Sequence, residues 1–377
     1  MPVPVLHVCD KFGVAGSSIH GVSRLFSWWF PRYDRKRFDV ALVGLKKPEP
    51  ASELLKQQGI PVHHLNRGKF DPRIVGDLVA LGRARQAQIF HVHGYAAADF
   101  GRLAARRIGA KLVLHEHFAD PRMPGYQALA DRLLAGLTDR AIAVSASTRE
   151  FLVRKRHVPA ARVRLLWNGA PLDEFASASR EQGLAVRRSL GIPEGALLFG
   201  IVGRLSEQKG HRHLLDAIAQ VFPQAPGAKL LVVGDGDRMA SLRAQAAALG
   251  VADRIVFAGH RSDVPEVLAA LDVFCISSIY EGTPLVLFEA MAAGKAIVST
   301  AVDGCREVLE DGVTALLAPA ASPAGLAAAL LRTAQDAGLR AGLADSARKA
   351  SVRYDIRECV RQMEALYDEV LAEGHAS

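Results

Sequence analysis

Residues 277–300 read SSIYEGTPLVLFEAMAAGKAIVST, and this stretch decides the fold. The apolar run VFCISS ends near Ser278, and the apolar run KAIVST closes the stretch. Between them, Thr283 is a good N-cap and Pro284 a good first helical residue, so we expect a helix to begin at about Pro284. A strand, a helix and a second strand in this order indicate a parallel sheet covered by helices.

The same alternation runs along the whole chain. Short apolar runs, typical of buried parallel strands, are separated by segments with apolar residues at helical spacing. We therefore predict an α/β fold with two parallel sheets. The strand candidates are PVLHVC, FDVALVGL, PVHHL, IFHVHG, KLVLHEH, RAIAVSAS, VRLLWNG, LLFGIVGRL, AKLLVVGDG, RIVFAGH, LDVFCISS, KAIVST and TALLAP.

A polar stretch, 173–195, divides the alternating pattern into two blocks. We expect a first domain over 1–172, a linker over 173–195 and a second domain over 196–355. A chain of 377 residues is long for one domain and suits two. Because ligands bind beyond the carboxyl ends of the strands in doubly wound sheets, the cleft between two such domains is the expected site.

Composition narrows the class of protein. Half of the residues are hydrophobic, and 47 basic residues against 39 acidic ones give a formal net charge of +8. The charge is spread, and no clustered basic helix or aromatic-interleaved strand suggests nucleic-acid binding. None of the four cysteines forms a C-x-x-C pair. No signal peptide is evident, and no apolar run approaches the ~18 residues of a spanning helix. We expect a cytoplasmic protein.

Two glutamates, Glu281 and Glu289, lie among apolar neighbours, where a carboxylate is costly unless it is satisfied. The expected helix start exposes the backbone N–H groups of Leu285 and Val286 at the positive end of the helix dipole, which is an anion site. Since carboxylates repel phosphate, the glutamates would accept hydrogen bonds from hydroxyls on either side of it. A nucleotide sugar has this layout, but a capped structural helix with an incidental glutamate pair fits equally.

A second loop points to the same ligand. The stretch GIVGRLSEQKG (200–210) places Arg204 and Lys209 just after a strand, in a loop with Gly203 and Gly210. A guanidinium grips phosphate through two hydrogen bonds and an ammonium acts as a point charge. The pair would therefore clamp a diphosphate, whereas the alternative for this loop alone is a solvated turn.

Five stretches of the second half carry a resemblance to a known family: GRLSEQKG, VVGDGD, VFAGHRSDVPEVLAALDVFCISS, YEGTPLVLFEAMAAGKAIVST and VDGCREVLEDGVTALL. Together and in this order they resemble the C-terminal half of family 4 glycosyltransferases, the retaining GT-B group. NGAPLDEF (168–175) is similar to the segment that ends the family's first domain, with one residue inserted. The resemblance implies two Rossmann-like domains facing a central cleft, with the C-terminal helix, 356–377, crossing back to the first.

The resemblance also implies roles for single residues. It implies that Glu281 contacts the donor sugar and that Glu289 contacts the ribose hydroxyls. Arg204 and Lys209 would hold the diphosphate, and the base would lie near His260. Glu281, Arg204 and Lys209 are the expected catalytic residues of the second domain. Its expected substrate-binding residues are Gly203, Gly259, His260, Arg261, Gly282, Thr283, Pro284, Leu285, Val286 and Glu289.

The first domain is expected to bind the acceptor. Its glycine-containing loop after the first strand, KFGVAGSSIHGVSRLF (11–26), contains Gly16, and glycine there lets the backbone approach a phosphate. Family members typically carry a Gly-Gly pair at this point, and this chain has His20-Gly21 instead. The exact roles within the loop therefore stay open.

Histidines end two strands of this domain, in FHVHG and LHEHF. Such a histidine can donate to sugar hydroxyls or accept an acceptor proton. A strand-end histidine of the family contacts the donor sugar; His117 resembles it best and is the fourth expected catalytic residue, with His115 the second choice. His93 is a further expected substrate-binding residue. A packed or solvated imidazole is the alternative for each.

The stretch LFSWWFPRYDRKRF (25–38) has two interpretations. Its aromatic residues beside four basic ones would dock on an anionic bilayer, which a lipid-linked acceptor would explain. Alternatively, the aromatic residues pack the first helix and the basic residues form a solvated loop. The second interpretation is slightly favoured.

We expect a retaining, metal-independent hexosyltransferase without a cofactor. The donor would be a nucleoside diphosphate sugar, most commonly a UDP-sugar, and the acceptor a hydroxyl of a sugar, a lipid-linked molecule or a small molecule in polysaccharide, glycolipid or glycoside synthesis. GDGD (234–237) fits a D-x-D metal pattern, but it lies in a turn that resembles the family's own. Two alternatives stay open: a GT-B sugar-nucleotide epimerase and a non-catalytic nucleotide-sugar-binding protein.

Overall fold

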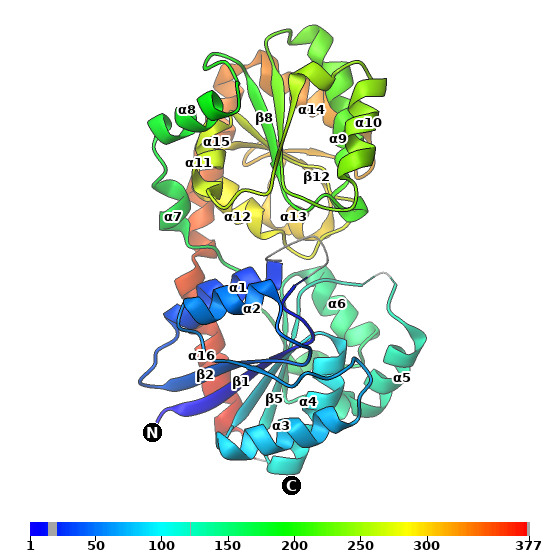
Figure 1. Cartoon of the computed structure of the whole chain (residues 1–377), viewed down its shortest axis with the longest axis vertical. Coiled ribbons are helices and arrows are strands. Elements are labelled where there is room, and N and C mark those ends of the chain that lie inside the picture. Colours follow the sequence, from blue (N-terminus) through cyan, green and yellow to red (C-terminus); the bar gives the residue numbers. More distant parts are fainter. Residues whose placement is uncertain (14–20, 121, 375–377) are drawn as a thin grey trace. The chain divides into compact units, whose positions relative to one another are not determined.

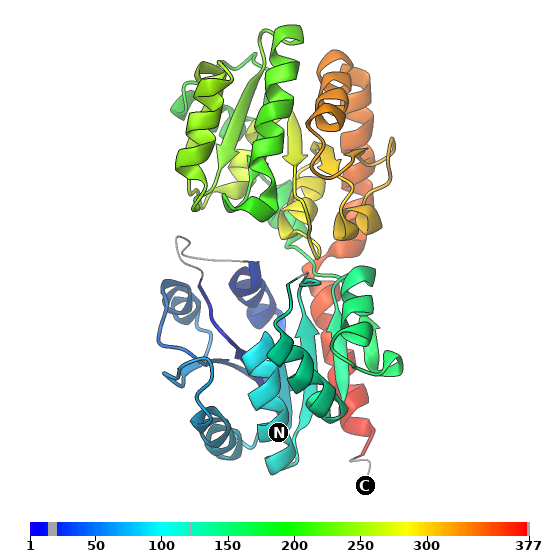
Figure 2. The same ribbon diagram turned by 90° about the vertical axis from the view of Figure 1, so that its right-hand side faces the viewer.

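The computed structural model describes residues 1–13, 21–120 and 122–374 of the chain. These residues form two compact units. Unit 1 extends to Asn168 and also contains the C-terminal segment from Ile356, whereas unit 2 is Gly169–Asp355. Each unit has its own sheet with helices on both faces (Figure 1 and Figure 2).

Unit 1 is built on a parallel sheet of seven strands in the order β3-β2-β1-β4-β5-β6-β7. The order reverses between β1 and β4, because β1 pairs with β2 on one side and with β4 on the other, as in Rossmann folds. The strands are β1 (Val3–Cys9), β2 (Phe38–Gly44), β3 (Val62–His64), β4 (Ile89–His93), β5 (Lys111–Glu116), β6 (Arg140–Ala143) and β7 (Val163–Leu165).

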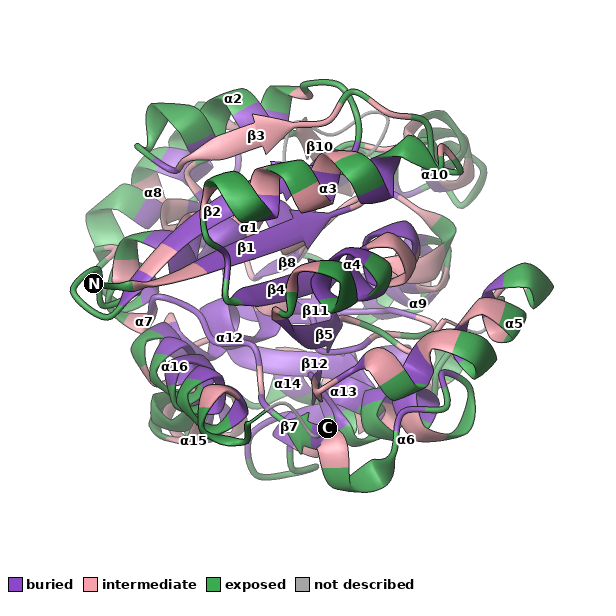
Figure 3. Ribbon diagram, turned by 90° about the horizontal axis from the view of Figure 1, so that it is seen from below, coloured by how far each residue is buried: buried purple, intermediate pink, exposed green. Residues whose placement is uncertain are grey.

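Alternate residues of the central strands face opposite sides of this sheet. Leu6 and Phe90 pack into an apolar core with α3 and α4, whereas His91 and His115 contact aromatic side chains of α16 and α1. Figure 3 shows these central strands as buried. The helices of unit 1 are α1 (Gly21–Trp29), α2 (Pro50–Gln57), α3 (Arg73–Ala84), α4 (Tyr95–Ile108), α5 (Gly125–Leu134), α6 (Ala146–Arg154) and α16 (Ile356–Ala372).

Unit 2 repeats the pattern with six parallel strands in the order β10-β9-β8-β11-β12-β13, and its order reverses between β8 and β11. The strands are β8 (Leu198–Val202), β9 (Lys229–Val233), β10 (Ile255–Gly259), β11 (Val273–Ile276), β12 (Ala296–Thr300) and β13 (Leu316–Ala318). The helices are α7 (Leu172–Ala176), α8 (Arg180–Ser189), α9 (His211–Val221), α10 (Met239–Ala248), α11 (Val264–Ala270), α12 (Leu285–Ala292), α13 (Asp303–Val308), α14 (Pro323–Gln335) and α15 (Ala337–Ser351).

The predicted fold class is confirmed, since both sheets are parallel and Rossmann-like. Each apolar run proposed as a strand overlaps one of the strands β1 to β13, and all but the first contain it entirely, since β1 begins one residue before PVLHVC. The boundary between the units is less simple than the sequence suggested. Residues 173–195, which we expected to form a linker, include α8, and a methyl group on Gly183 would lie 2.7 Å from the Ala269 carbonyl carbon of α11.

The side chain of Arg187 explains why this polar stretch belongs to unit 2. Its guanidinium donates hydrogen bonds to the carbonyl oxygens of Ala270 and Ala196, both at 2.8 Å, and lies 2.9 Å from Asp272. Because the arginine is buried, its polar contacts anchor α8 to α11 and to the start of β8. The polar stretch 173–195 therefore contains a buried hydrogen-bonding residue, Arg187, as well as exposed polar residues.

The C-terminal helix α16 packs against the sheet of unit 1. Tyr367 is completely buried, and its hydroxyl lies 2.6 Å from His91 Nδ1 and 3.2 Å from His7 Nε2. Glu364 accepts a hydrogen bond from the backbone N–H of Asp34 at 2.7 Å. In the described part of the chain, no helix combines the length and the apolar character needed to cross a bilayer.

The bilayer interpretation of 25–38 is wrong. Phe26, Trp29 and Phe30 are completely buried and Trp28 is only 7% exposed, because these side chains fill the space between α1 and the sheet. The basic residues also have local partners: the Arg35 guanidinium donates to the Phe30 carbonyl oxygen at 3.0 Å. The packing interpretation therefore holds for this stretch.

Candidate active site

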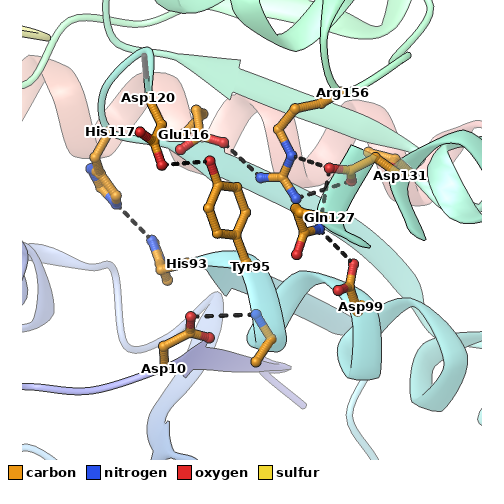
Figure 4. Close-up of polar contacts among 12 residues, drawn as sticks. Asp10, His93, Tyr95, Asp99, Glu116, His117, Asp120, Gln127, Asp131 and Arg156 are labelled. Atoms are coloured by element: carbon orange, nitrogen blue, oxygen red, sulfur yellow. Dashed lines mark hydrogen bonds and ion pairs between the residues drawn. The ribbon is translucent and has the colours of Figure 1, made fainter. Parts of the chain in front are cut away.

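The reversal of strand order marks the expected ligand position in each unit, and the helix that follows it is capped differently in the two. In unit 1 this helix is α4. The carboxylate of Asp10 accepts hydrogen bonds from the backbone N–H groups of Ala97 at 2.6 Å and Ala96 at 3.3 Å (Figure 4). Gly94 leaves room for it, since a methyl group there would lie 2.6 Å from Asp10 Oδ2. The α4 terminus is thus already occupied by a carboxylate.

In unit 2 the corresponding helix is α12, and its N-cap residue makes no side-chain capping hydrogen bond in the described part of the chain. Pro284 is its N-cap residue, with extended backbone, and Leu285 is the first helical residue. The helix therefore begins one residue later than the sequence suggested. Its first turn is half-buried and carries no acidic residue. An uncapped helix start presents N–H groups and a positive partial charge to an anion.

Four of the predicted residues line one small cavity at this point: Gly203, Lys209, Pro284 and Val286. Gly203 and Lys209 follow β8, and Pro284 and Val286 lie at the start of α12, which follows β11. The order of strands reverses between β8 and β11. His211, the first residue of α9, lines the same cavity. Burial lowers the pKa of His211 to about 3, so this imidazole is neutral.

An ion pair joins the same two loops. Lys209 Nζ lies 2.6 Å from Glu281 Oε1, which also accepts a hydrogen bond from Ser278 Oγ at 2.7 Å. The Glu281 side chain is 7% exposed and that of Lys209 is 23% exposed. Ser277 Oγ donates to the Lys209 carbonyl oxygen at 2.8 Å, so the backbones are tied as well. Both side chains are consequently held in position by contacts within unit 2.

Arg204 is the free cation of this loop. Among the described residues its guanidinium has no hydrogen-bond or ion-pair partner, although the residue is half-buried. Two contacts with the GDGD turn support this loop. The N–H group of Leu205 donates a hydrogen bond to the Asp235 carbonyl oxygen at 2.9 Å. Gly234 packs so closely that a methyl group on it would lie 2.0 Å from the Gly203 carbonyl oxygen. The GDGD turn therefore supports the cationic loop through its backbone.

The two aspartates of the GDGD turn, Asp235 and Asp237, differ in their surroundings. Asp235 Oδ2 accepts a hydrogen bond from the backbone N–H of His260 at 3.1 Å, which fixes the loop after β10. The Asp237 side chain is 75% exposed. In the loop after β10, Gly259 has a positive φ of 68°, and Arg261 pairs with Asp263 at 2.9 Å. Asp235 thus connects the GDGD turn to the three residues expected near the base.

Gly282 and Thr283 are buried, and α13 packs directly on them. A methyl group on Gly304 would lie 1.3 Å from the Gly282 carbonyl oxygen, so only glycine fits there. Sequence reasoning did not select Gly304, although its place in a quoted family stretch could have drawn attention to it. Glu289 lies in the second turn of α12 and is completely buried.

The histidines of unit 1 form a connected ladder on one face of the sheet. His117 Nε2 lies 3.0 Å from His93 Nδ1, and His93 Nε2 lies 3.1 Å from His7 Nδ1. His91 Nε2 lies 3.1 Å from His115 Nδ1. His93 and His115 are buried, at 2% and 0% exposure, whereas His117 is half-buried. Of the three predicted residues, His117 is therefore the one with access to a ligand.

Two groups of three ladder imidazoles, His7–His91–His93 and His93–His115–His117, bring ring nitrogens within 4.8 Å of one another. Such a group could hold a metal ion. The rings of His115 and His117, however, stack at 4.4 Å with only 15° between their planes. Because a metal ion lies close to the plane of each ligating ring, stacked rings fit hydrogen bonding along the ladder better than a shared ion.

Beside the ladder, a buried ionic network holds the end of β5. Arg156 lies 2.6 Å from Glu116 and 2.9 Å from Asp131, and all three side chains are buried (Figure 4). Tyr95 donates to Asp120 at 3.0 Å on the other side of the β5 end. The network fixes the strand end that carries His117. Sequence reasoning missed it because its members are up to 40 residues apart in the chain.

Of the glycine-containing loop, 11–26, the structure describes residues 11–13 and 21–26. Gly16 lies outside the described residues. At the start of the loop, Glu49 Oε2 accepts hydrogen bonds from the backbone N–H groups of Phe12 at 2.5 Å and Gly13 at 2.9 Å. This contact of the loop with the N-cap residue of α2 was not predicted either.

Two Rossmann-like units with this arrangement place the protein in the GT-B class of folds. Residues 184–350 match the family model described as glycosyl transferases group 1, and residues 21–174 match the model described as glycosyltransferase family 4. The chain belongs to glycosyltransferase family 4.

Individual relatives agree with this assignment. The 2-deoxystreptamine N-acetyl-D-glucosaminyltransferase of Streptomyces fradiae is 33% identical over 320 residues, which cover 78% of this chain and 72% of that protein. The UDP-Gal:alpha-D-GlcNAc-diphosphoundecaprenol alpha-1,3-galactosyltransferase of Escherichia coli is 26% identical over 301 residues, covering 76% and 77%.

A solved structure shares the fold. The structure of Anabaena Alr3699/HepE in complex with UDP has a TM-score of 0.85 and 24% sequence identity, covering 97% of this chain and 100% of that one. The predicted GT-B fold and the predicted family are thereby confirmed.

Proposed function

We propose that this glycosyltransferase moves a hexosyl group from a nucleoside diphosphate sugar, most commonly a UDP-sugar, to a hydroxyl acceptor with retention at the anomeric carbon. The observation that carries the proposal is the start of α12, whose N-cap residue provides no side-chain cap, beside the Lys209–Glu281 pair and Arg204, which has no ion-pair partner among the described residues. One unit thus offers a helix terminus and two cations to an anion, next to a buried carboxylate.

The donor is assigned to these groups by charge. The diphosphate is bound by the N–H groups at the start of α12 and by the side chains of Arg204 and Lys209. Glu281 accepts hydrogen bonds from sugar hydroxyls, and Glu289 from the ribose. The base lies against Gly259, His260 and Arg261. UDP bound to the Anabaena protein supports the choice of nucleotide for this chain.

In the reaction, the bond between the anomeric carbon and the phosphate oxygen breaks, and a bond from the acceptor oxygen to that carbon forms on the same face. The negative charge that develops on the leaving diphosphate is stabilised by Arg204, Lys209 and the α12 dipole. The donor phosphate takes the acceptor proton. His117, held by His93, donates to a sugar hydroxyl.

The acceptor is proposed only as a hydroxyl-bearing molecule. The two relatives described above act on different kinds of acceptor by their names, a diphosphoundecaprenol-linked sugar in one case and 2-deoxystreptamine in the other. We therefore propose an acceptor from polysaccharide, glycolipid or small-molecule glycoside synthesis.

Calorimetric titration with UDP, GDP and ADP tests the donor site first. We expect UDP to bind most tightly, and a Kd above the millimolar range for all three nucleotides would overturn the assignment. NMR of incubations with UDP-sugars and an acceptor panel then tests transfer and retention. Conversion of the donor without an acceptor would indicate an epimerase, and tight binding without any turnover would indicate a binding protein.

A further inference from the structure

The histidine ladder of unit 1 has a buried inner end and an outer end at the candidate site. At the inner end, His115 is completely buried, and its Nε2 has no hydrogen-bond partner among the described residues. The ring of Trp29 stacks on His115, with centroids 5.3 Å apart. At the outer end, half-buried His117 turns its Nε2 toward His93. The ring nitrogen of His117 that the ladder does not engage is therefore Nδ1.

The imidazoles inside the ladder are neutral, which gives the ladder a direction. Burial holds the pKa values of four of them well below 6.5: His7, His91, His93 and His115. A neutral imidazole has one N–H donor and one acceptor nitrogen. Both nitrogens of His7, His91 and His93 have partners in the ladder. Each of these rings must therefore donate on one side and accept on the other.

The buried end decides which way the hydrogen bonds run. A proton on His115 Nε2 would be a buried N–H without an acceptor in the described part of the chain, and folded proteins rarely contain such a group. The proton is better placed on His115 Nδ1, which then donates to His91 Nε2 at 3.1 Å. His91 must in turn carry its own proton on Nδ1 and donate it to the Tyr367 hydroxyl at 2.6 Å. The first two steps thus run outward from His115.

The hydroxyls of Tyr33 and Tyr367 pass this direction on to His7. Their oxygens lie 3.1 Å apart, and each is 3.2 Å from His7 Nε2. Because His91 already donates here, a proton on His7 Nε2 would leave one hydroxyl, among the described residues, with at best the sulfur of Met363 at 3.8 Å, a weak acceptor. With a lone pair on His7 Nε2, both hydroxyl protons reach a nitrogen or an oxygen. His7 therefore accepts on this side and carries its proton on Nδ1.

We propose that this directed ladder fixes His117 as the neutral tautomer with its proton on Nδ1. His7 Nδ1 donates to His93 Nε2 at 3.1 Å, and His93 Nδ1 donates to His117 Nε2 at 3.0 Å (Figure 4). A second proton on His117 would set two N–H groups against each other across that distance. Any hydrogen bond that His117 makes outside the ladder through its ring nitrogens is therefore donated from Nδ1.

The ladder residues behind His117 are consequently positioning residues: His7, His91, His93, His115 and Tyr367. They act through the chain of hydrogen bonds and select one of the two tautomers between which a free imidazole divides its proton. This role rests on the proposed function, in which the acceptor of the Nδ1 hydrogen bond is a hydroxyl oxygen of the sugar.

Long-range proton–nitrogen NMR on the full chain, labelled with ¹⁵N-histidine and without nucleotide, reads the tautomer directly. Protonated and unprotonated ring nitrogens have well-separated ¹⁵N chemical shifts. The spectrum is recorded at about pH 8, where imidazoles are neutral, and the signals of His117 are identified by their absence from His117→Gln. We expect Nδ1 to have the shift of a protonated nitrogen and Nε2 that of an unprotonated one. A proton on Nε2, or averaged shifts from exchange between both tautomers, would overturn the proposal.

Two hydroxyl deletions test whether the tautomer is set through the ladder. Tyr367→Phe breaks the path between His91 and His7, and Tyr33 can then either donate to His7 or accept from it. Both tautomers of His117 should become populated, so its two ¹⁵N shifts should move toward each other. Tyr33→Phe removes another buried hydroxyl but keeps that path, and the shifts should stay as in the wild type. A single unchanged tautomer in Tyr367→Phe, or equal changes in both variants, would refute the ladder as the cause.

His7→Gln cuts the ladder one step nearer to His117. The amide of glutamine reaches the position of His7 Nε2 but not that of Nδ1, so His93 loses its donor and the tautomers of His117 should again mix. A retained Nδ1 tautomer would contradict the relay independently of the tyrosine variants. Because no spectrum requires a nucleotide, the result is separate from the donor-site proposal. A fixed Nδ1 tautomer in a protein that binds no UDP would support the ladder and overturn the proposed function.

Discussion

The ammonium group of Lys209 lies 2.6 Å from the carboxylate of Glu281, so the cation proposed for the diphosphate and the anion proposed for the sugar form an ion pair with each other. The pair is only partly exposed, and the hydrogen bond from Ser278 keeps Glu281 in position on its own. A diphosphate can therefore take over Lys209 without displacing Glu281. This arrangement gives the two residues separable roles.

Replacing Glu281 by Ala should separate transfer from binding. We expect the rate of transfer to fall by at least about a hundredfold while the affinity for UDP stays within about tenfold, because UDP lacks the sugar that we propose Glu281 to contact. Calorimetry gives the affinity and single-turnover kinetics the rate. Glu207→Ala, at a 68% exposed side chain of the neighbouring loop, is the control and should transfer normally. Parallel losses of UDP affinity and transfer in Glu281→Ala would contradict the assigned role.

Replacing Lys209 or Arg204 by Ala should weaken UDP binding by about tenfold or more each, since each charge-assisted hydrogen bond contributes about 1.5–3 kcal/mol. Calorimetry at low salt measures this directly. Arg212→Ala removes an exposed cation from the first turn of α9 and should change the affinity by less than about twofold. An unchanged affinity in Lys209→Ala would remove this residue from the clamp.

Replacing Gly304 by Ala should damage the donor loop without touching a ligand. The added methyl group would lie 1.3 Å from the Gly282 carbonyl oxygen, so the loop or α13 must move. We expect a loss of about 1–3 kcal/mol in unfolding free energy together with weaker UDP binding. Gly342→Ala, in the open middle of α15, should instead stabilise by up to about 1 kcal/mol. Chemical denaturation measures both, and a Gly304→Ala protein as stable as Gly342→Ala would be inconsistent with the packing described.

The histidine ladder should make unit 1 sensitive to acid. Burial lowers the pKa of His7 to about 3 and holds the pKa values of His91, His93 and His115 well below 6.5. Between those values and 6.5 the unfolded chain binds protons that the folded unit does not. The contribution of these histidines to the unfolding free energy should be constant well above pH 6.5 and fall below it by about 1.4 kcal/mol per pH unit for each histidine. Asp99, whose pKa is raised by burial to about 6, contributes in the opposite direction.

Urea denaturation between pH 8 and pH 5, followed by a probe in unit 1, measures this slope. His115→Gln should reduce the slope of unfolding free energy against pH by the contribution of one histidine. His157→Asn is the control and should leave the slope unchanged. His157 is exposed and has a positive φ, which Asn tolerates. A slope that is as steep in His115→Gln as in the wild type would contradict the lowered pKa of His115.

The parts of the fold that could be predicted are those in which neighbouring residues carry the signal. VFCISS, GTPLVLFE and KAIVST predicted β11, α12 and β12 because buried parallel strands are continuously apolar and because a proline favours the start of a helix, although α12 begins one residue after Pro284. The loop residues Arg204, Lys209 and Glu281 could be selected for the same reason, since each follows a recognisable strand. Their ion pair could not, because it depends on how two loops 72 residues apart meet.

The missed features all depend on distant partners. Asp10 caps α4 from 87 residues away, and His7 meets Tyr367 across 360 residues. Phe26 and Trp29 in 25–38 fit a core and a bilayer equally well by composition, and only packing against the sheet distinguishes the two. In α5 the apolar spacing is visible in the sequence, but the burial of Asp131 by Arg156 decides which side faces outward.

The placement of α16 has a consequence for biosynthesis. Unit 1 combines residues that are synthesised before unit 2 with α16, which is synthesised after it and whose Tyr367 covers His7 and His91. During translation the face of its sheet that bears the imidazoles stays open until α16 has been synthesised. A nascent chain stalled before Ile356 would thus expose that face to solvent and to chaperones.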